Sequence, residues 1–170
     1  MKSPPKSIEI KVDTREKCPL LFPANLEWHR DRGLDSGHLI KIKVKEAKLD
    51  YGDYLLSNWP SCAVIERKGS LDELNQNLLS DDFTRFTSAL RRMCENCRHP
   101  YLLLDASVTA LWTPTQYCTS PERVWDALCS ILGTFNVRLL WGSNAKHAGP
   151  RRILGEQVLR ILLAHALREE

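Results

Sequence analysis

Two carboxylates and one lysine lie close together in a predicted β-hairpin. Two short, mainly apolar runs, at 53–57 and 62–68, flank a turn made of Asn, Trp, Pro and Ser, residue types that favour a tight connection. In antiparallel register Asp53 lies opposite Glu66, and opposed residues share a face with Cβ atoms about 5 Å apart. Strand alternation adds Lys68 to that face. A shift of one residue would move Asp53 to the other face.

The chemistry of such a group points to a divalent metal. Opposed carboxylates repel each other, and two of them with carbonyls and waters form a hard-oxygen site suited to Mg²⁺ or Mn²⁺. A nearby lysine could orient an attacking water or help to deprotonate it, while the metal stabilises charge on a phosphoryl oxygen. From spacing alone, an ordinary solvated strand face is the simpler explanation for Glu66 and Lys68.

The surrounding pattern predicts an α/β domain. Alternating apolar and polar residues predict half-buried strands, and Ser70 with Glu73 is a capping-box signature for a helix. We expect early antiparallel strands, later crossovers, and a central mixed β-sheet flanked by helices. The predicted order is β, loop or short helix, β, β, β, α, α, β, α, β, α, with strands at 7–13, 38–48, 53–57, 62–68, 101–106 and 137–142, and helices after 70, from 82, at 121–133 and at 149–169.

Composition excludes several classes of protein. The chain has 170 residues, 43% hydrophobic and 26% charged, with 24 basic and 21 acidic side chains. These fractions are typical of globular proteins, and a net charge of +3 permits nucleic-acid binding without requiring it. No apolar run approaches the roughly 20 residues of a membrane span, so we expect no membrane partner. The N-terminus lacks a secretory h-region, and the six cysteines indicate reduced thiols. We therefore expect a cytoplasmic protein, nucleoid-associated in a prokaryote or nuclear in a eukaryote.

Three short segments carry a family resemblance. The sequences VDTRE (12–16), GDY (52–54) and ERKGSLD (66–72) resemble the nuclease domain of the XPF family of structure-specific DNA endonucleases. The family pattern is D-x-R-E, then G-D, a gap, E-R-K, three residues and D. Every position of this pattern is filled, by Asp13, Arg15, Glu16, Gly52, Asp53, Glu66, Arg67, Lys68 and Asp72.

This resemblance implies a restriction-endonuclease-like fold and an endonuclease that uses Mg²⁺ or Mn²⁺. It suggests Asp53, Glu66 and the Arg67 main-chain carbonyl as metal ligands. Lys68 would serve the water and the charge of the transition state, and Asp13 would bind a second metal or lie behind the ligands.

Arg15, Asp72 and Arg85 are further candidate site residues. Arg15, like Arg67, could contact a phosphate or an acidic neighbour. Asp72 could orient Lys68 or Arg67, or simply complement the helix dipole. Arg85 precedes Phe86 in a stretch where the family often has a basic residue, so it is a candidate phosphate contact.

The resemblance also predicts the organisation of the chain. We expect one nuclease domain over 1–170, with the motifs in about 8–95 and a homodimer formed through about 100–170, but no helix-hairpin-helix or helicase module. A separate DNA-binding partner could then be needed. The expected substrate is branched, flap or fork DNA near a duplex–single-strand junction. The alternatives are a nuclease for unbranched DNA and a non-catalytic DNA-binding or scaffold subunit.

Three other features remain ambiguous. A lysine stripe could track a DNA backbone, although a solvated face or a protected edge strand is the simpler explanation. A basic group before the last helix could bind phosphate or be surface charge. A Cys-x-x-Cys pair with a histidine is half of a zinc site at most. These features are Lys41, Lys43, Lys45 and Lys48; Lys146, His147, Arg151 and Arg152; and Cys94, Cys97 and His99.

Overall fold

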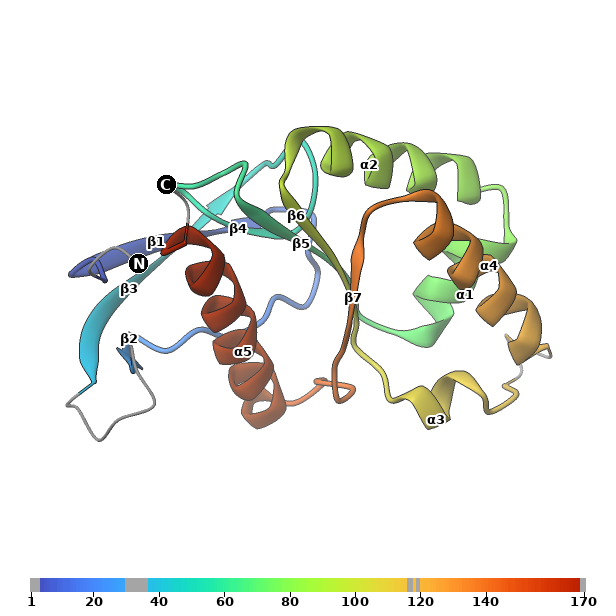
Figure 1. Cartoon of the computed structure of the whole chain (residues 1–170). Coiled ribbons are helices and arrows are strands. Elements are labelled where there is room, and N and C mark those ends of the chain that lie inside the picture. The colour runs from blue at the N-terminus through green and yellow to red at the C-terminus, as the bar shows by residue number, and fades with distance from the viewer. Residues whose placement is uncertain (1–3, 30–36, 116–117, 119, 169–170) are drawn as a thin grey trace.

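A mixed β-sheet forms the centre of the molecule (Figure 1). The computed structural model describes residues 4–29, 37–115, 118 and 120–168, and within these ranges the strand order is β2-β3-β1-β4-β5-β6-β7. The strands are β1 (Ser7–Asp13), β2 (Asn25–Trp28), β3 (His38–Ala47), β4 (Tyr54–Leu56), β5 (Ala63–Lys68), β6 (His99–Leu104) and β7 (Arg138–Trp141).

The sheet combines both strand directions. β4 pairs antiparallel with β1 and β5, β6 pairs parallel with β5 and β7, and β2 pairs antiparallel with β3. The predicted mixed sheet is confirmed, but β3 pairs parallel with β1, where we expected the early strands to be antiparallel. The missed strand β2 explains the difference, because it carries the chain to the far side of β3. It has four residues and only Leu26 is buried, too short for a visible period.

Five helices in the described ranges cover the sheet. They are α1 (Leu71–Leu79), α2 (Phe83–Asn96), α3 (Val108–Leu111), α4 (Pro121–Thr134) and α5 (Ala148–Ala166). The predicted capping box is present, since the Ser70 hydroxyl accepts from the Glu73 N–H at 3.2 Å. Only the single-turn helix α3 was not predicted. No helix among the described residues is long and apolar enough to cross a membrane.

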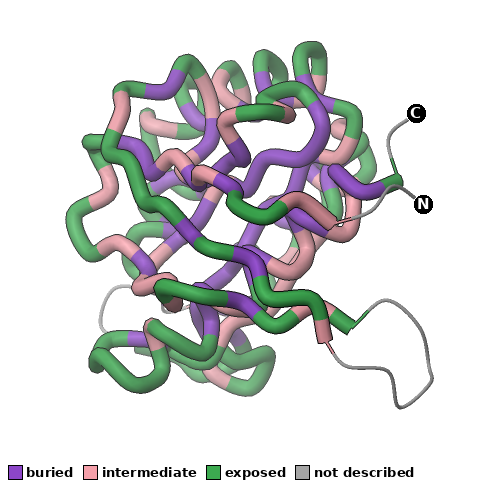
Figure 2. Tube along the Cα trace, turned by 90° about the vertical axis from the view of Figure 1, so that its left-hand side faces the viewer, coloured by how far each residue is buried: buried purple, intermediate pink, exposed green. Residues whose placement is uncertain are grey.

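Two apolar clusters lie on opposite faces of the sheet. On one face, α5 packs through Leu154, Val158 and Leu162 against the buried isoleucines of β1 and β3. On the other, α1, α2 and α4 pack over β4 to β7. Figure 2 shows buried residues alternating with exposed ones along the strands nearest the viewer. Each buried Leu or Ile contributes about 1.5–3 kcal/mol, so these clusters hold the strand ends in place.

Two helical glycines should respond in opposite ways to alanine. A Cβ on Gly155 in α5 would lie 2.2 Å from the Leu21 carbonyl oxygen, whereas a Cβ on Gly133 in α4 would meet nothing within 4 Å. We expect Gly155→Ala to lower the free energy of unfolding by about 1–3 kcal/mol through overpacking. Gly133→Ala should raise it by about 0.5–1 kcal/mol through helix propensity. Urea unfolding of both variants tests this, and equal effects would contradict the packing of α5.

Candidate active site

The hairpin of β4 and β5 has the predicted register. Leu55 pairs with Val64 and Tyr54 with Ile65, so continuing the ladder sets Asp53 opposite Glu66. Regular pairing stops at Asp53, whose N–H donates to the Ile65 carbonyl at 2.8 Å while its carbonyl accepts from β1. Asp53 therefore lies at a break in the ladder, between β1 and β5.

The carboxylate of Asp53 accepts a hydrogen bond that a backbone carbonyl would accept in a regular ladder. Its Oδ2 accepts from the Arg67 N–H at 2.7 Å. Gly52, the residue before it, has φ +68°, a conformation that glycine adopts without strain, and a Cβ there would lie 2.2 Å from Val64 Cγ1. The Gly-Asp pair is thus a turn that only glycine fits, followed by a carboxylate aimed at the end of β5.

Asp53 and Glu66 form an electrostatically unfavourable pair. Burial raises the pKa of Asp53 well above its usual value, and the negative charge of Glu66 raises it further, against the lowering effect of the Arg67 N–H. A carboxylate in this state lacks enough positive charge nearby. This is the condition under which a cation would stabilise the site.

Lys68 supplies part of that charge. Its Nζ donates to Glu66 Oε1 at 2.9 Å and to Glu73 Oε1 at 3.4 Å, and it lies 4.7 Å from the centre of the Phe86 ring. Burial alone would lower the pKa of Lys68, but the charge and hydrogen bond of Glu66, with the charge of Glu73, leave that pKa raised. Lys68 is therefore an ammonium ion at neutral pH, a donor and not a base.

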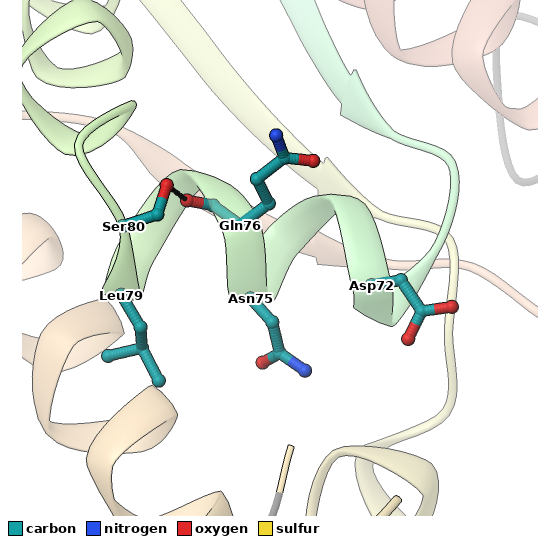
Figure 3. A pocket seen from close by; sticks show the side chains of 5 residues that line it. All are labelled: Asp72, Asn75, Gln76, Leu79 and Ser80. Atoms are coloured by element: carbon teal, nitrogen blue, oxygen red, sulfur yellow. Dashed lines mark hydrogen bonds between the residues drawn. The ribbon is translucent and has the colours of Figure 1, made fainter. Parts of the chain in front are cut away.

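Glu73 is a site residue that sequence reasoning missed. Its Oε2 accepts from the Gly69 N–H at 3.0 Å, so one carboxylate completes the cap of α1 and contacts Lys68. The capping box of Ser70 and Glu73 was the available signal in the sequence, but by itself it predicts only the start of a helix. Asp72, the predicted candidate, instead lines a hollow of about 500 Å³ along α1 with Asn75, Gln76, Leu79 and Ser80 (Figure 3). Lys68 and Arg67 have other partners, and a role for Asp72 in orienting them stays a prediction.

The Arg67 side chain lies on the other face of the sheet. Its Nη2 donates to Asp105 Oδ2 at 2.6 Å and its Nη1 to the Cys18 carbonyl at 2.9 Å, with Glu16 Oε2 at 3.4 Å. Arg67 and Asp105 are 4% and 1% exposed. Of the two predicted interpretations, the acidic neighbours are the ones observed. The guanidinium holds the segment after β1 against the end of β5.

Asp105 is the second residue that the sequence did not reveal. It follows β6, and its Oδ1 accepts from the N–H groups of Ser143 and Ala145 at 3.2 and 3.0 Å. It therefore joins the β7–α5 connection to Arg67. An acidic residue that ends a buried strand beside the end of β5 is a signal that could have found it.

The segment after β1 has two further attachments. The Leu20 N–H donates to the Tyr54 hydroxyl at 3.0 Å, and Arg151 Nε donates to the Pro19 carbonyl at 2.8 Å. Arg151 is therefore a structural contact, where the sequence suggested a phosphate contact or surface charge.

Asp13 has a full set of hydrogen-bond donors. Its carboxylate accepts from the Arg15 N–H and Nε at 2.7 Å each, from Arg15 Nη2 at 2.9 Å and from the Leu49 N–H at 2.7 Å. Burial would raise the pKa of Asp13, but these bonds hold it below its usual value. Asp13 thus anchors the β3–β4 connection that leads to Asp53. Its predicted role at a metal stays a prediction, and Arg15 is paired with an acid as one interpretation expected.

Two remaining candidates lie on α2. Arg85 is exposed and pairs with Asp82 at 3.1 Å, one residue from the Phe86 ring beneath Lys68, so its phosphate contact stays a prediction. Cys97 packs in the apolar cluster, its Sγ 3.6 Å from the Cys62 carbonyl. Among the described residues no three His, Cys, Asp or Glu side chains converge as a metal site.

Comparison with known proteins places the chain in a family. Residues 12–149 match the family model described as the ERCC4 domain. The chain belongs to this family. Among solved structures it is similar to XPF from Aeropyrum pernix (TM-score 0.58, 16% identity, covering 95% of this chain and 66% of that one). It is also similar to XPF from Aeropyrum pernix in complex with DNA (TM-score 0.56, 15% identity, covering 96% and 68%). No curated protein sequence matches it. These likenesses confirm the restriction-endonuclease-like fold.

Replacing Asp53 should change how stability depends on pH. Because the folded state raises this pKa above the usual 3.8, it binds the proton more tightly than the unfolded chain does. The associated stability is present at low pH and is lost as pH rises from about the unfolded value through the folded pKa. In EDTA we expect Asp53→Asn to become more stable than the parent across this range. Thermal unfolding from pH 4.5 to 8 measures the difference, and a constant difference would refute the strained pair.

Removing the partner of Arg67 should be costly. Asp105→Asn leaves a buried guanidinium with Glu16, at 3.4 Å, as its remaining counter-charge, and breaking a buried pair lowers the free energy of unfolding by about 3–5 kcal/mol. Asp126 is exposed on α4, so Asp126→Asn is the matched control and should change stability by less than about 0.5 kcal/mol. Urea unfolding compares the two, and a small effect at Asp105 would mean that the network does not hold the fold together.

Proposed function

We propose that this protein is a divalent-metal-dependent DNA endonuclease. The observation that carries the proposal is the strained pair of Asp53 and Glu66 beside the protonated Lys68. A pure DNA-binding subunit gains nothing from burying two carboxylates together. Membership of the ERCC4 domain family and the similarity to an XPF chain in complex with DNA support the same conclusion.

The donors present fit Mg²⁺ or Mn²⁺. Asp53 and Glu66 offer carboxylate oxygens, which these hard cations prefer. The Arg67 carbonyl is a third metal-ligand candidate. Adjacent carbonyls of a strand point toward opposite neighbouring strands, and the Lys68 carbonyl accepts from the Asp105 N–H on the β6 side. The Arg67 carbonyl therefore faces the β4 side, where Asp53 ends the ladder. When bound, the cation would stabilise charge on a phosphoryl oxygen and lower the pKa of a water.

The other parts of the hydrolysis would depend on side chains of the protein. Lys68, held by Glu66 and Glu73, donates hydrogen bonds, so it can orient the attacking water or neutralise a phosphate oxygen. Water adds to phosphorus, the bond to the 3′ oxygen breaks, and that oxygen takes up a proton. The products are 5′-phosphate and 3′-hydroxyl ends. Arg15, which feels the charges of Asp53 and Glu66, is the nearby exposed cation for a flanking phosphate.

The substrate and assembly belong to the same proposal. We expect cleavage of branched, flap or fork DNA near a duplex–single-strand junction, in the nucleoid of a prokaryote or the nucleus of a eukaryote. A homodimer through 100–170 would bury large apolar side chains, and this half exposes Val108, Trp112 and Ile153. A separate DNA-binding partner is compatible with such a homodimer. The non-catalytic subunit and the nuclease for unbranched DNA are outcomes of the test.

Cleavage of end-labelled DNA tests the proposal. Duplex, single-strand, splayed-arm and 3′-flap substrates are incubated with Mg²⁺, Mn²⁺ or EDTA, and product ends are identified on sequencing gels. We expect metal-dependent cuts near the junction, lowered by a factor on the order of 10³ in Asp53→Ala and in Glu66→Gln.

The controls separate the alternatives. Asp126→Asn removes an exposed carboxylate on α4 and should cut like the parent, and circular dichroism confirms that each variant is folded. A folded parent that cuts no substrate would favour the non-catalytic subunit, and equal cutting of unbranched DNA would favour the simpler nuclease. Undiminished cutting by Asp53→Ala would show that this is not the active site.

A further inference from the structure

No helix in the described part of the chain lies over one face of the strands β2, β3 and β1. α5 covers their other face, and the cluster under α1, α2 and α4 includes only Ala47 from these three strands. In Figure 1 these strands extend away from α2 and α4. The uncovered face carries the lysines Lys11, Lys41, Lys43 and Lys45, which we call the lysine face; all but the half-buried Lys11 are exposed.

Edge protection does not explain the whole group of lysines. Lysines on an edge strand prevent pairing with another chain. The ladder between β3 and β2 covers only His38–Lys41, so Lys43 and Lys45 lie beyond the β2 ladder, on a stretch of β3 that is open on that side among the described residues. Lys11 and Lys41, in contrast, lie on backbone that is paired on both sides, so for these two another explanation is required.

The register places like charges side by side. Lys11 is the direct partner of Lys45 in the β1–β3 ladder, an arrangement that destabilises a sheet. None of the ion pairs among the described residues involves a residue of the lysine face. Two acids lie on this face: Glu9 is the direct partner of Lys43 and accepts from the Ser57 hydroxyl at 2.6 Å, and Glu27 pairs with Leu39 at the edge. The row of Lys11 and Lys45 continues instead into the apolar Leu55 and Val64.

The lysine face and the carboxylates share one side of the sheet. Lys11 pairs with Leu55, and Leu55 with Val64, and partners across a ladder point the same way. Glu66 follows Val64 by two residues, so it points to this side as well. The row of Lys11 and Lys45 is the next one along the strands from the row of Asp53 and Glu66.

We propose that the lysine face binds the sugar-phosphate backbone of DNA whose cleaved bond lies at Asp53 and Glu66. This inference rests on the proposed function and adds a surface to it. From Lys41 to Lys45 the stripe spans roughly 13 Å, the axial length of about four phosphates of one strand. Lysine suits this role because its flexible stem carries a point charge to a phosphate without reading sequence. The repulsion between Lys11 and Lys45 is relieved when phosphates lie over them.

The test compares two double variants that remove equal charge. Lys11→Gln with Lys45→Gln removes the row next to the carboxylates. Arg123→Gln with Arg168→Gln is the matched control, because both side chains are exposed, Arg123 on α4 and Arg168 just after α5. Binding of fluorescent splayed-arm DNA is measured by anisotropy in EDTA, which prevents cleavage, from 50 to 300 mM salt.

We expect the lysine variant to bind roughly tenfold more weakly at 0.1 M salt, with the slope of log K against log salt reduced by about two. The control should keep the parent slope. The melting temperature of the lysine variant should be equal or higher, because a repulsion has been removed. An unchanged slope, or an equal loss in the control, would overturn the proposal.

Cleavage under saturating DNA separates this inference from the proposed function. If the protein is a nuclease and the lysine face binds its substrate, the lysine variant has a raised KM and a kcat near that of the parent. If the parent cuts but the variant matches it in KM and slope, the lysine face is wrong and the nuclease stands. If no protein cuts yet the slope still falls, the face binds DNA and the nuclease proposal fails.

Discussion

The buried pair of Arg67 and Asp105 is the contact on which the site depends. Two connections meet at the ends of β5 and β6, namely the segment after β1 and the connection from β7 to α5. Arg67 holds the segment after β1 through the Cys18 carbonyl, and Asp105 holds the β7–α5 connection through two N–H groups. Burying two charges is expensive, and the cost is recovered only when nearly all their hydrogen-bonding groups are used. The pair fixes the position of the end of β5, and the other face of that strand end carries Glu66 and Lys68.

Because side chains alternate along β5, the residues that hold the fold together point to one face of the sheet and the candidate catalytic residues point to the other. Ile65 and Arg67 point toward the α5 side, and Glu66 and Lys68 point toward α2. On the structural face, the charge of Arg67 is directly paired with Asp105 at 2.6 Å and lies 3.4 Å from Glu16. The chemical face is left strained, with Asp53 and Glu66 sharing the charge of Lys68. A fold tolerates such a local repulsion where the neighbouring contacts hold the groups in place. Here the Gly52 turn and the hydrogen bond from the Arg67 N–H hold Asp53.

Local patterns made the hairpin predictable, whereas long-range contacts did not follow from the sequence. The turn length fixed the register of β4 and β5, and alternation then placed Asp53, Glu66 and Lys68 together. Arg67 and Asp105 are separated in the sequence by α1, α2 and β6. Only the crossover from β5 to β6 brings them together, and no sequence periodicity indicates that they pair. Glu73 and Asp72 are neighbours in the same helical turn, and the cap decides which of them reaches Lys68. The short β2 also escaped prediction, and with it the parallel pairing of β1 and β3.

The same topology explains why a basic surface can lie beside an acidic site without cancelling it. Salt bridges between exposed charges contribute little, typically below about 1 kcal/mol, so lysines one row away do not neutralise the half-buried pair of Asp53 and Glu66. Their field nevertheless extends over a Debye length of about 8–10 Å at ordinary ionic strength. A polyanion is therefore attracted to the open strands, while the carboxylates keep the local deficit of positive charge that favours a cation. Because the helices cover only β4 to β7 on this side, one sheet offers both environments.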